Sequence, residues 1–328
     1  METDLPPIAN FISNILLIML LITFVYALFI RFVSDETLFD RILLPSNDPR
    51  KLTYYIEPCQ NYNDTTIFPT IFDYSELTLS IVIPAKNEEI RISTTLNDCI
   101  SFLHYKQSLT STFTWEIIVV DDYSSDRTTD TVLSIAKEHP EVRLLRQPQK
   151  MGYGKAVQAG CSHCRGKLIL IVDPDNSTKI EEYNELENQI RELSKINSEA
   201  IVIGSRTHLF SKRSDLSKYF LLFPFLGIKG IQDGLSSFKL ITKSAARWIF
   251  PNQHVTGPAS KAEIILIAKA RGMAISEFPV EWMETDTPSE GILTRLQNFC
   301  EFVEIALFYR LGLWTIRQKS HIHNDSEI

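Results

Sequence analysis

The chain of 328 residues has little cysteine, no excess of positive charge, and no charged side chain at all between Ile8 and Ile30. Its five cysteines are too few for a disulfide framework. Cys161 and Cys164 form a C-S-H-C, but no second pair or histidine cluster follows at zinc spacing, which favours a structural role. The net charge of -7 argues against a general nucleic-acid-binding protein, because such proteins need a basic face.

The uncharged stretch from Ile8 to Ile30 is long enough to cross a bilayer as a helix, which takes ~20 apolar residues. A cleaved signal peptide would have a basic start and a small-residue cleavage site, whereas Glu2 and Asp4 precede this stretch and no such site follows it. We therefore predict an uncleaved single-pass anchor at residues 1–30. Basic residues begin at Arg31 and none precedes the stretch, so the main domain is expected in the cytosol.

The remaining composition, with 44% hydrophobic and 22% charged residues, is typical of a folded protein. Residues 31–76 are mixed and rich in Pro, Asn, Asp and Tyr, as expected of a juxtamembrane linker. The main domain is predicted at residues 77–290. Residues 291–316 are apolar but interrupted by charges, which favours amphipathic helices at a membrane interface over a span, with core packing helices as the alternative. Residues 317–328 form a polar tail.

Buried strands are predicted in "LTLSIVIP", "WEIIVVD", "VRLLRQ" and "GKLILIV", and helical spacing follows the first three. Alternation of this kind indicates an α/β fold with a mostly parallel sheet that is covered by helices. Ligands of such sheets bind outside the carboxyl ends of the strands. The sequence therefore places its candidate site at that edge.

Acidic and polar residues follow three of these strands. Asp173 and Asp175 come after the fourth, and residues two apart in an extended segment point the same way. Two carboxylates on one side suit a divalent cation such as Mg²⁺, although an acidic turn that only ends a strand is the simpler alternative. Asp121 and Asp122 end the second strand, and residues 84–88 end the first. Convergence of all three at one edge favours a ligand site.

The segments "IVIPAKNEE", "IIVVDDYSSDRT", "GYGKA" and "VDPD" resemble the nucleotide-sugar motifs of the family-2 glycosyltransferases, which have a Rossmann-like GT-A fold. The segments "NSTKI", "IGSRTHL" and "GIQDGLSSFKL" resemble the dolichyl-phosphate glucosyltransferases of the endoplasmic reticulum membrane. The resemblance runs from Leu79 to Trp314. It implies transfer of glucose from UDP-glucose to dolichyl phosphate, with inversion at the anomeric carbon, for assembly of the N-glycan precursor at the lipid bilayer.

The resemblance also implies roles for individual residues. Nucleotide binding falls on Pro84, Ala85, Asn87, Glu88, Asp121, Asp122, Gly152, Gly154 and Lys155. Mg²⁺ or Mn²⁺ would be held by Asp122, Asp173 and Asp175, and the catalytic positions are Asp173, Asp175, Arg206, Asp233 and Lys239. Gly152 equally fits an ordinary turn at a helix start, and a surface salt bridge is the alternative for Arg206.

The sequence departs from the family pattern mainly in its acceptor half. The family's D-T-Q-C-G-F-K reads "DGLSSFK" here, and H-V-E-R-W-A-F-D-V-E reads "HVTGPASKAE", which puts Gly257 at the arginine and Lys261 at the aspartate. Tyr123 and Tyr153 replace a glycine and a lysine. Two hypotheses follow: an active transferase in which Lys261 or Lys155 holds the acceptor phosphate, or an inactive member with a structural role as a homo-oligomer or larger assembly.

Overall fold

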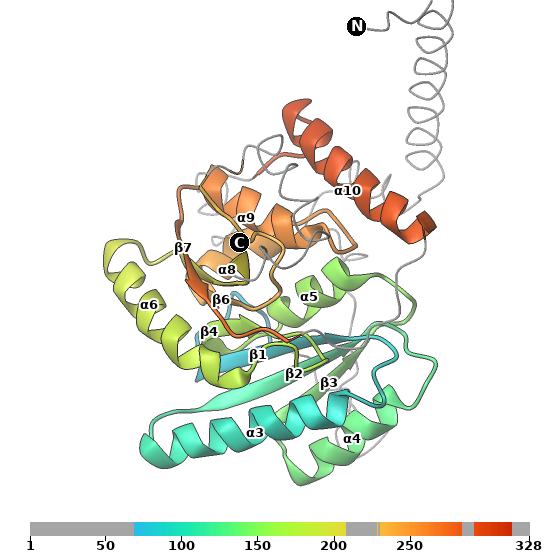
Figure 1. Cartoon of the computed structure of the whole chain (residues 1–328). Coiled ribbons are helices and arrows are strands. Elements are labelled where there is room, and N and C mark those ends of the chain that lie inside the picture. The colour runs from blue at the N-terminus through green and yellow to red at the C-terminus, as the bar shows by residue number, and fades with distance from the viewer. Residues whose placement is uncertain (1–68, 208–227, 229, 284–291, 317–328) are drawn as a thin grey trace, which may run out of the picture. The chain divides into compact units, whose positions relative to one another are not determined.

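A computed structural model describes residues 69–207, 228, 230–283 and 292–316, all within the second of two units of the chain, Thr53–Ile328 (Figure 1). A seven-stranded sheet forms its centre, in the order β3-β2-β1-β4-β6-β5-β7. The strands are β1 Leu77–Ala85, β2 Trp115–Asp121, β3 Val142–Arg146, β4 Gly166–Ile171, β5 Ala200–Ser205, β6 Lys239–Thr242 and β7 Ala274–Pro279. Only β6 pairs antiparallel with its neighbours, so the predicted mostly parallel α/β sheet is confirmed.

Helices cover both faces of the sheet (Figure 1). The first face carries α3 Ile92–Leu109, α4 Thr128–Glu138 and α6 Tyr183–Ile196, the last preceded by the short 3₁₀ helix Ile180–Glu182. The other face carries α5 Tyr153–Ser162, α8 Lys243–Ile249 and α9 Ser260–Ala270, with a second 3₁₀ helix at Phe250–Asn252. The last described helix is α10 Ile292–Arg310.

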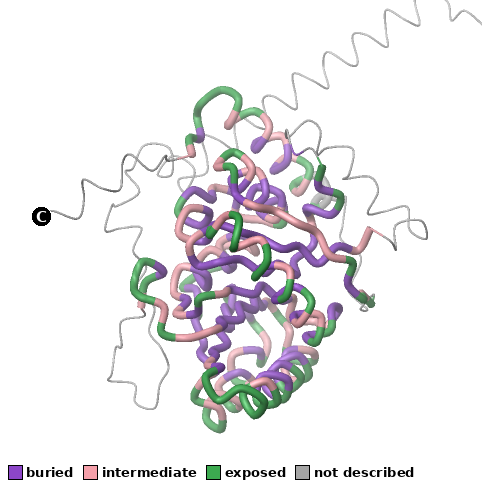
Figure 2. Tube along the Cα trace, turned by 90° about the vertical axis from the view of Figure 1, so that its left-hand side faces the viewer, coloured by how far each residue is buried: buried purple, intermediate pink, exposed green. Residues whose placement is uncertain are grey.

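The strands read as continuous apolar runs because both of their faces are buried, as Figure 2 shows along the sheet. Leu79, Ile81 and Ile83 of β1 belong to the core under α3 and α6. Val82 points to the other face, where α5 lies so close that a Cβ on Gly160 would be 2.5 Å from a methyl carbon of Val82. The buried residues of β1 from Leu79 onward therefore pack on the two faces of the sheet.

The strand register brings the candidate residues to one edge. Ala85 pairs with Asp121, and Val82 pairs with Ile171, so β1, β2 and β4 end side by side. Because β6 is antiparallel, its first residue, Lys239, pairs with Ile171 and reaches the same edge. A sheet of this topology thus collects three strand ends and one strand start at a single edge.

Several sequence predictions fall outside the described residues. These are the anchor at residues 1–30, most of the linker at residues 31–76 and the tail at residues 317–328. In the part of the chain that the structure covers, no helix combines the length and the hydropathy needed to cross a bilayer.

Candidate active site

The segment that carries Asp173 and Asp175 leaves β4 in a fixed turn. The Val172 amide donates to the carbonyl of Val82 at 3.0 Å, and the Thr95 hydroxyl of α3 donates to the carbonyl of Pro174 at 2.8 Å. The Ser177 amide donates to Oδ1 of Asp175 at 3.1 Å. Both carboxylates are half-buried, and the turn presents them together at the edge of the sheet.

The Asp173 and Asp175 pair fits a divalent cation. Burial raises the pKa of Glu88, Arg91 opposes this shift, and the nearby charges of Asp175 and Asp173 add to it. Three carboxyl groups in one neighbourhood favour a cation there, and hard oxygen ligands suit Mg²⁺ or Mn²⁺. Among the residues that the structure describes, however, no three acidic, histidine or cysteine side chains form a metal cluster. Asp173 and Asp175 therefore remain the candidate carboxylates for a cation at this edge.

Asp122, the third predicted metal ligand, has other contacts in the structure. Its Oδ1 accepts hydrogen bonds from the amides of Met151 at 2.6 Å and Gly152 at 3.1 Å, and its Oδ2 accepts from Gly152 at 3.0 Å. Asp121 is fully buried, and its carboxylate accepts hydrogen bonds from the Ser124 amide and the Thr129 hydroxyl. The structure therefore does not bring Asp122 into the Asp173 and Asp175 pair, and a ligand role for Asp121 or Asp122 stays a prediction.

Pro84 and Ala85 end β1 at this edge, and the two residues that follow Lys86 shape the loop. Asn87 has a positive φ of 55°, its amide donates to Ser124 Oγ at 2.9 Å, and its Oδ1 accepts from the Ser125 amide at 2.9 Å. The Glu88 carboxylate accepts two hydrogen bonds from Arg91, both at 2.8 Å. The loops after β1 and β2 are thus joined into one wall of the crevice.

Gly152 and Gly154 serve the protein's own backbone. Gly152 has a φ of +95°, and a Cβ there would lie 2.6 Å from the carbonyl oxygen of Thr256. A Cβ on Gly154 would lie 2.4 Å from the carbonyl oxygen of Val255. Both positions require glycine so that the start of α5 can approach residues 255–256. Gly152 directly precedes α5, which fits the turn at a helix start considered for it from the sequence, and a ligand contact of either glycine stays a prediction.

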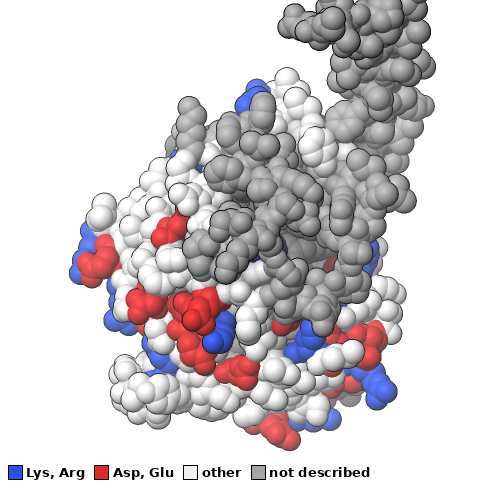
Figure 3. Space-filling model, viewed as in Figure 1, with Lys and Arg blue, Asp and Glu red and all other residues white. Residues whose placement is uncertain are grey.

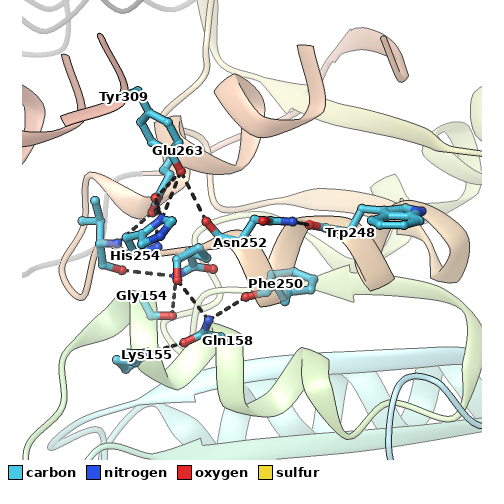
Figure 4. A network of polar contacts seen from close by, with 11 residues as sticks. Gly154, Lys155, Gln158, Trp248, Phe250, Asn252, His254, Glu263 and Tyr309 are labelled. Carbon is cyan, nitrogen blue, oxygen red and sulfur yellow. Dashed lines mark hydrogen bonds and ion pairs between the residues drawn. The ribbon is translucent and has the colours of Figure 1, made fainter. Parts of the chain in front are cut away.

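Lys155, a predicted phosphate partner, directs its ammonium to Oε1 of Gln158 at 2.5 Å. Gln158 in turn donates to the carbonyl of Phe250 at 2.6 Å, as Figure 4 shows. Gln253 donates to the carbonyl of Gly154 at 2.8 Å from the same segment. Lys155 therefore belongs to a network that ties α5 to the segment after α8.

Arg206 follows β5 and forms a buried ion pair with Asp233, in place of the surface salt bridge considered from the sequence. Its Nε and Nη2 donate to the two carboxylate oxygens at 2.7 and 2.9 Å, and its amide donates to Oδ2 at 2.9 Å. Burial alone would raise the pKa of Asp233, but the Arg206 contacts hold that pKa below its usual value. The guanidinium also lies over the ring of Trp282, 5.6 Å from its centroid. Sequence analysis missed this role of Trp282, although it lies just past β7 at the same edge.

Lys239 is almost fully buried, at 1% exposure, and binds its own loop. Its ammonium donates to the carbonyls of Gly234 at 3.2 Å and of Ser236. Burial lowers the pKa of Lys239 to about 7; Asp233 opposes this shift, whereas Lys261 and Arg206 add to it. Lys239 thus closes the loop at residues 233–238, which leads into β6 at the same edge of the sheet.

The lowered pKa of Lys239 predicts a pH-dependent stability. Between about pH 7 and the unfolded value of 10.5, the unfolded chain binds more protons than the folded one, so the free energy of unfolding rises with pH in this window. We expect the stability of the wild type, relative to Lys239→Met, to increase by about 2 kcal/mol between about pH 7 and about pH 9. Urea unfolding of both chains at each pH measures this difference, and a constant difference would contradict a neutralised lysine.

Two departures from the family pattern meet in the crevice. The ammonium of Lys261, at the start of α9, lies 4.4 Å from the ring centroid of Tyr153, at the start of α5. Burial, followed by the charge of Asp173, raises the pKa of Tyr153. Tyr153 thus contacts Lys261 and lies close enough to Asp173 for that charge to act on it. The sequence treated these two substitutions separately and gave no sign of their contact.

Tyr123, the third departure, has a positive φ of 58° and a side chain that is 54% exposed. A non-glycine residue in this region of φ is uncommon and costs strain, which fits a position where the family pattern that the sequence resembles has glycine. The ring points to solvent and is not packed in the core.

Helix α10 and the residues after it contact α9 and the loop that precedes it. The Tyr309 hydroxyl donates to Oε1 of Glu263 at 2.8 Å, and His254 Nδ1 lies 3.2 Å from that hydroxyl and 3.3 Å from that oxygen (Figure 4). The His254 ring is also stacked on Trp314, with centroids 4.7 Å apart. Glu301 accepts from the Ala259 amide at 3.1 Å. The sequence matched His254 and Glu263 to the family but missed their partners in α10.

Gly257 lies under the same helix. A Cβ at this position would be 2.0 Å from Oε1 of Glu301, so a larger residue requires Glu301 to move. The loss of the family arginine at Gly257 is therefore linked to the way α10 packs in this chain.

A separate hollow of about 530 Å³ lies beside the site and is lined by Lys179, Glu181, Glu182 and Glu281. Acidic side chains gather on the face of the molecule shown in Figure 3. Lys179 is paired with Glu281 at 3.0 Å, and the Glu281 amide donates to Oε1 of Glu182 at 3.1 Å, so three glutamates and one lysine line the hollow. Such a hollow repels phosphate groups, so the candidate site remains at the edge of the sheet.

Comparisons with known proteins agree with this geometry. The model of the family described as "Glycosyl transferase family 2" matches residues 80–250. A dolichyl-phosphate beta-glucosyltransferase of Trichomonas vaginalis is 48% identical over 97% of both chains. The dolichyl-phosphate beta-glucosyltransferase of Homo sapiens is 32% identical, covering 76% of this chain and 81% of its own.

Solved structures share the fold at low identity. Mannosyl-3-phosphoglycerate synthase from Rubrobacter xylanophilus has a TM-score of 0.53 at 16% identity, covering 74% of this chain and 77% of its own. Glucosyl-3-phosphoglycerate synthase from Mycobacterium tuberculosis, solved with Mn²⁺, UDP-glucose and glycerol 3-phosphate, has a TM-score of 0.50 at 18% identity, covering 74% and 82%. These likenesses support the expected GT-A fold. The chain belongs to family 2 of the glycosyl transferases and, within it, to the family of dolichyl-phosphate beta-glucosyltransferases.

Proposed function

We propose that this protein transfers glucose from UDP-glucose to dolichyl phosphate and so forms dolichyl phosphate glucose, with inversion at the anomeric carbon, for N-glycan precursor assembly. The observation that carries the proposal is the pair of carboxylates, Asp173 and Asp175, at the carboxyl edge of the sheet in a chain whose relatives bear this activity in their names. The likeness to a synthase solved with Mn²⁺ and UDP-glucose supports a metal-dependent donor site.

The residues present suit this reaction. A phosphate monoester is largely ionised at neutral pH, because its second pKa lies near ~6, so the acceptor oxygen needs no general base to attack C1 of the sugar. Asp173 and Asp175 would hold Mg²⁺ or Mn²⁺, which supplies charge neutralisation for the departing diphosphate. The loops after β1 and β2 form the donor side of the crevice, and the loop at residues 233–238 with the start of α9 forms the acceptor side.

The alternative is a family member that no longer transfers sugar and has a structural role. The relatives do not support it, because they are named as glucosyltransferases. Two positions at which this chain departs from the family pattern, Tyr153 and Lys261, are in contact with each other. Contact between the two substituted residues fits an altered acceptor-binding site better than it fits two independent losses of functional residues. Assembly into a homo-oligomer or a larger structure stays a prediction.

We also propose that the protein is anchored in the endoplasmic reticulum membrane by residues 1–30, with its main domain in the cytosol and α10 lying on the bilayer. Phe299 and Leu307 share one face of α10, because they are eight residues apart, and both are exposed together with Leu311, which directly follows the helix. The opposite face is buried through Phe302 and Ile305. An exposed apolar stripe above a packed face is typical of an interfacial helix.

This placement predicts labelling of α10 by a lipid-borne photoreactive probe. In vesicles that contain the full chain, we expect the peptide with Leu307 and Leu311 to be labelled, and the double change to glutamate to reduce that labelling several-fold. Leu109 of α3, which is 65% exposed, provides the matched control and should remain unlabelled. Equal labelling at Leu109 and α10, read by mass spectrometry, would refute the placement.

The proposed function is tested by donor and acceptor choice. The detergent-solubilised full chain with Mn²⁺ is offered labelled UDP-glucose or GDP-mannose, each with dolichyl phosphate or dolichol. We expect product only from UDP-glucose with the phosphorylated lipid. Transfer of mannose would overturn the sugar assignment, and transfer to dolichol would overturn the acceptor chemistry.

A further inference from the structure

The cations expected to hold phosphate in the crevice are already engaged by protein groups. Arg206 is held by both carboxylate oxygens of Asp233, and Lys239 by two backbone carbonyls. An incoming anion must compete with these contacts, so neither residue offers its full charge to a substrate. Asp233 is likewise occupied by Arg206.

Lys261 differs from both. Within the described part of the chain, its ammonium forms no ion pair. Its nitrogen lies 4.4 Å from the ring centroid of Tyr153. The side chain is half-buried. A cation over an aromatic face retains its charge for an anion while its flexible stem is held in place.

The position of Lys261 is fixed by backbone packing. A Cβ on Gly154 would lie 2.7 Å from Cβ of Ser260, so the starts of α5 and α9 are in direct contact. Tyr153 lies close enough to Asp173 for that charge to act on its hydroxyl, and Lys261 lies close enough to Lys239 to act on its ammonium. Lys261 thus lies beside the start of α5, in the same neighbourhood as Lys239 and Asp173.

We infer that Lys261 binds the phosphate of the lipid acceptor, and that Tyr153 is a positioning residue that holds the ammonium in place. The inference rests on the proposed function and identifies the group that binds its acceptor, a phosphate monoester of a lipid alcohol. In the transfer step, a phosphate oxygen forms a bond to C1 of the sugar. The bond from C1 to the diphosphate breaks, and UDP leaves with its electron pair. No proton has to be moved at Lys261.

The test separates acceptor binding from turnover. Calorimetry measures binding of farnesyl phosphate, a short lipid monophosphate, and of UDP-glucose to the full chain in detergent with Mn²⁺. We expect Lys261→Met to lower the affinity for farnesyl phosphate about tenfold or more, while the affinity for UDP-glucose stays within about twofold of the wild type. Lys261→Arg should recover most of the loss. Lys269→Met, on the same helix, is the matched control and should leave both affinities within about twofold.

Variants of Tyr153 test the positioning role. Tyr153→Phe keeps a ring under the ammonium, and Tyr153→Leu removes it. Tyr153→Leu should therefore lower the affinity for farnesyl phosphate several-fold more than Tyr153→Phe does. Equal effects of the two changes would overturn the role of the ring.

The outcomes distinguish this inference from the proposed function. If Lys261→Met leaves farnesyl phosphate binding unchanged, or weakens both ligands equally, the assignment of Lys261 is overturned even when the wild type transfers glucose. If binding depends on Lys261 but the wild type transfers no sugar, the phosphate assignment holds and the proposed function is overturned.

Discussion

Replacement of Asp173 by asparagine is expected to lower the rate of glucose transfer about a hundredfold or more. Asparagine keeps the shape of the side chain and removes the charge that a metal-bound diphosphate requires. Asp173 provides the cleaner test of the pair, since Asp175 also accepts the Ser177 amide that fixes the turn. Initial rates at saturating UDP-glucose, measured over a range of Mn²⁺ concentrations, report the loss.

Asp130→Asn provides the matched control. Asp130 is an exposed carboxylate in the first turn of α4, and its removal should leave the rate within about twofold. If Asp173→Asn retained a rate close to that of the control, the carboxylate pair would not be the metal site.

Replacement of Glu116 by alanine is expected to destabilise the fold by about 3–5 kcal/mol. Glu116 is fully buried in β2 and its Oε2 accepts from Arg143 at 3.0 Å and from Arg165 at 2.9 Å. Its Oε1 accepts from the Ser80 hydroxyl at 2.6 Å and from the Arg165 amide at 2.7 Å. Removal of the carboxylate takes the counter-charge from a buried arginine and breaks contacts that join β1, β2, β3 and the start of β4.

Urea unfolding measures the effect against Glu192→Ala. Glu192 forms an exposed ion pair with Lys195 at 2.6 Å, and such pairs contribute at most about 1 kcal/mol. A similarly small loss for Glu116→Ala would show that the buried network is not needed for stability. Glu116 lies away from the site, so the folded fraction of the variant should keep its transfer rate.

The sequence predicts the sheet and its functional edge because buried parallel strands are continuous apolar runs, and their carboxyl ends must lie together. The short strand β6 was not predicted, since four residues, "KLIT", carry little periodic signal. Its antiparallel direction nevertheless decides the site, because it places Lys239 beside the end of β4.

The contacts of individual site residues could not be predicted to the same extent. Whether Asp122 binds a metal or the amides of Met151 and Gly152 depends on how two loops pack, which local pattern does not encode. The same holds for Tyr153 and Lys261, which are far apart in the chain and meet only because α5 and α9 start at the same place.

The measurement that most directly tests this account is formation of dolichyl phosphate glucose by the full wild-type chain from UDP-glucose and dolichyl phosphate, with Mn²⁺, beside Asp173→Asn. The account predicts a β-linked product from the wild type and at least about a hundredfold less from the variant. Well-folded wild-type protein that binds UDP-glucose but forms no product with Mg²⁺ or Mn²⁺ would contradict it.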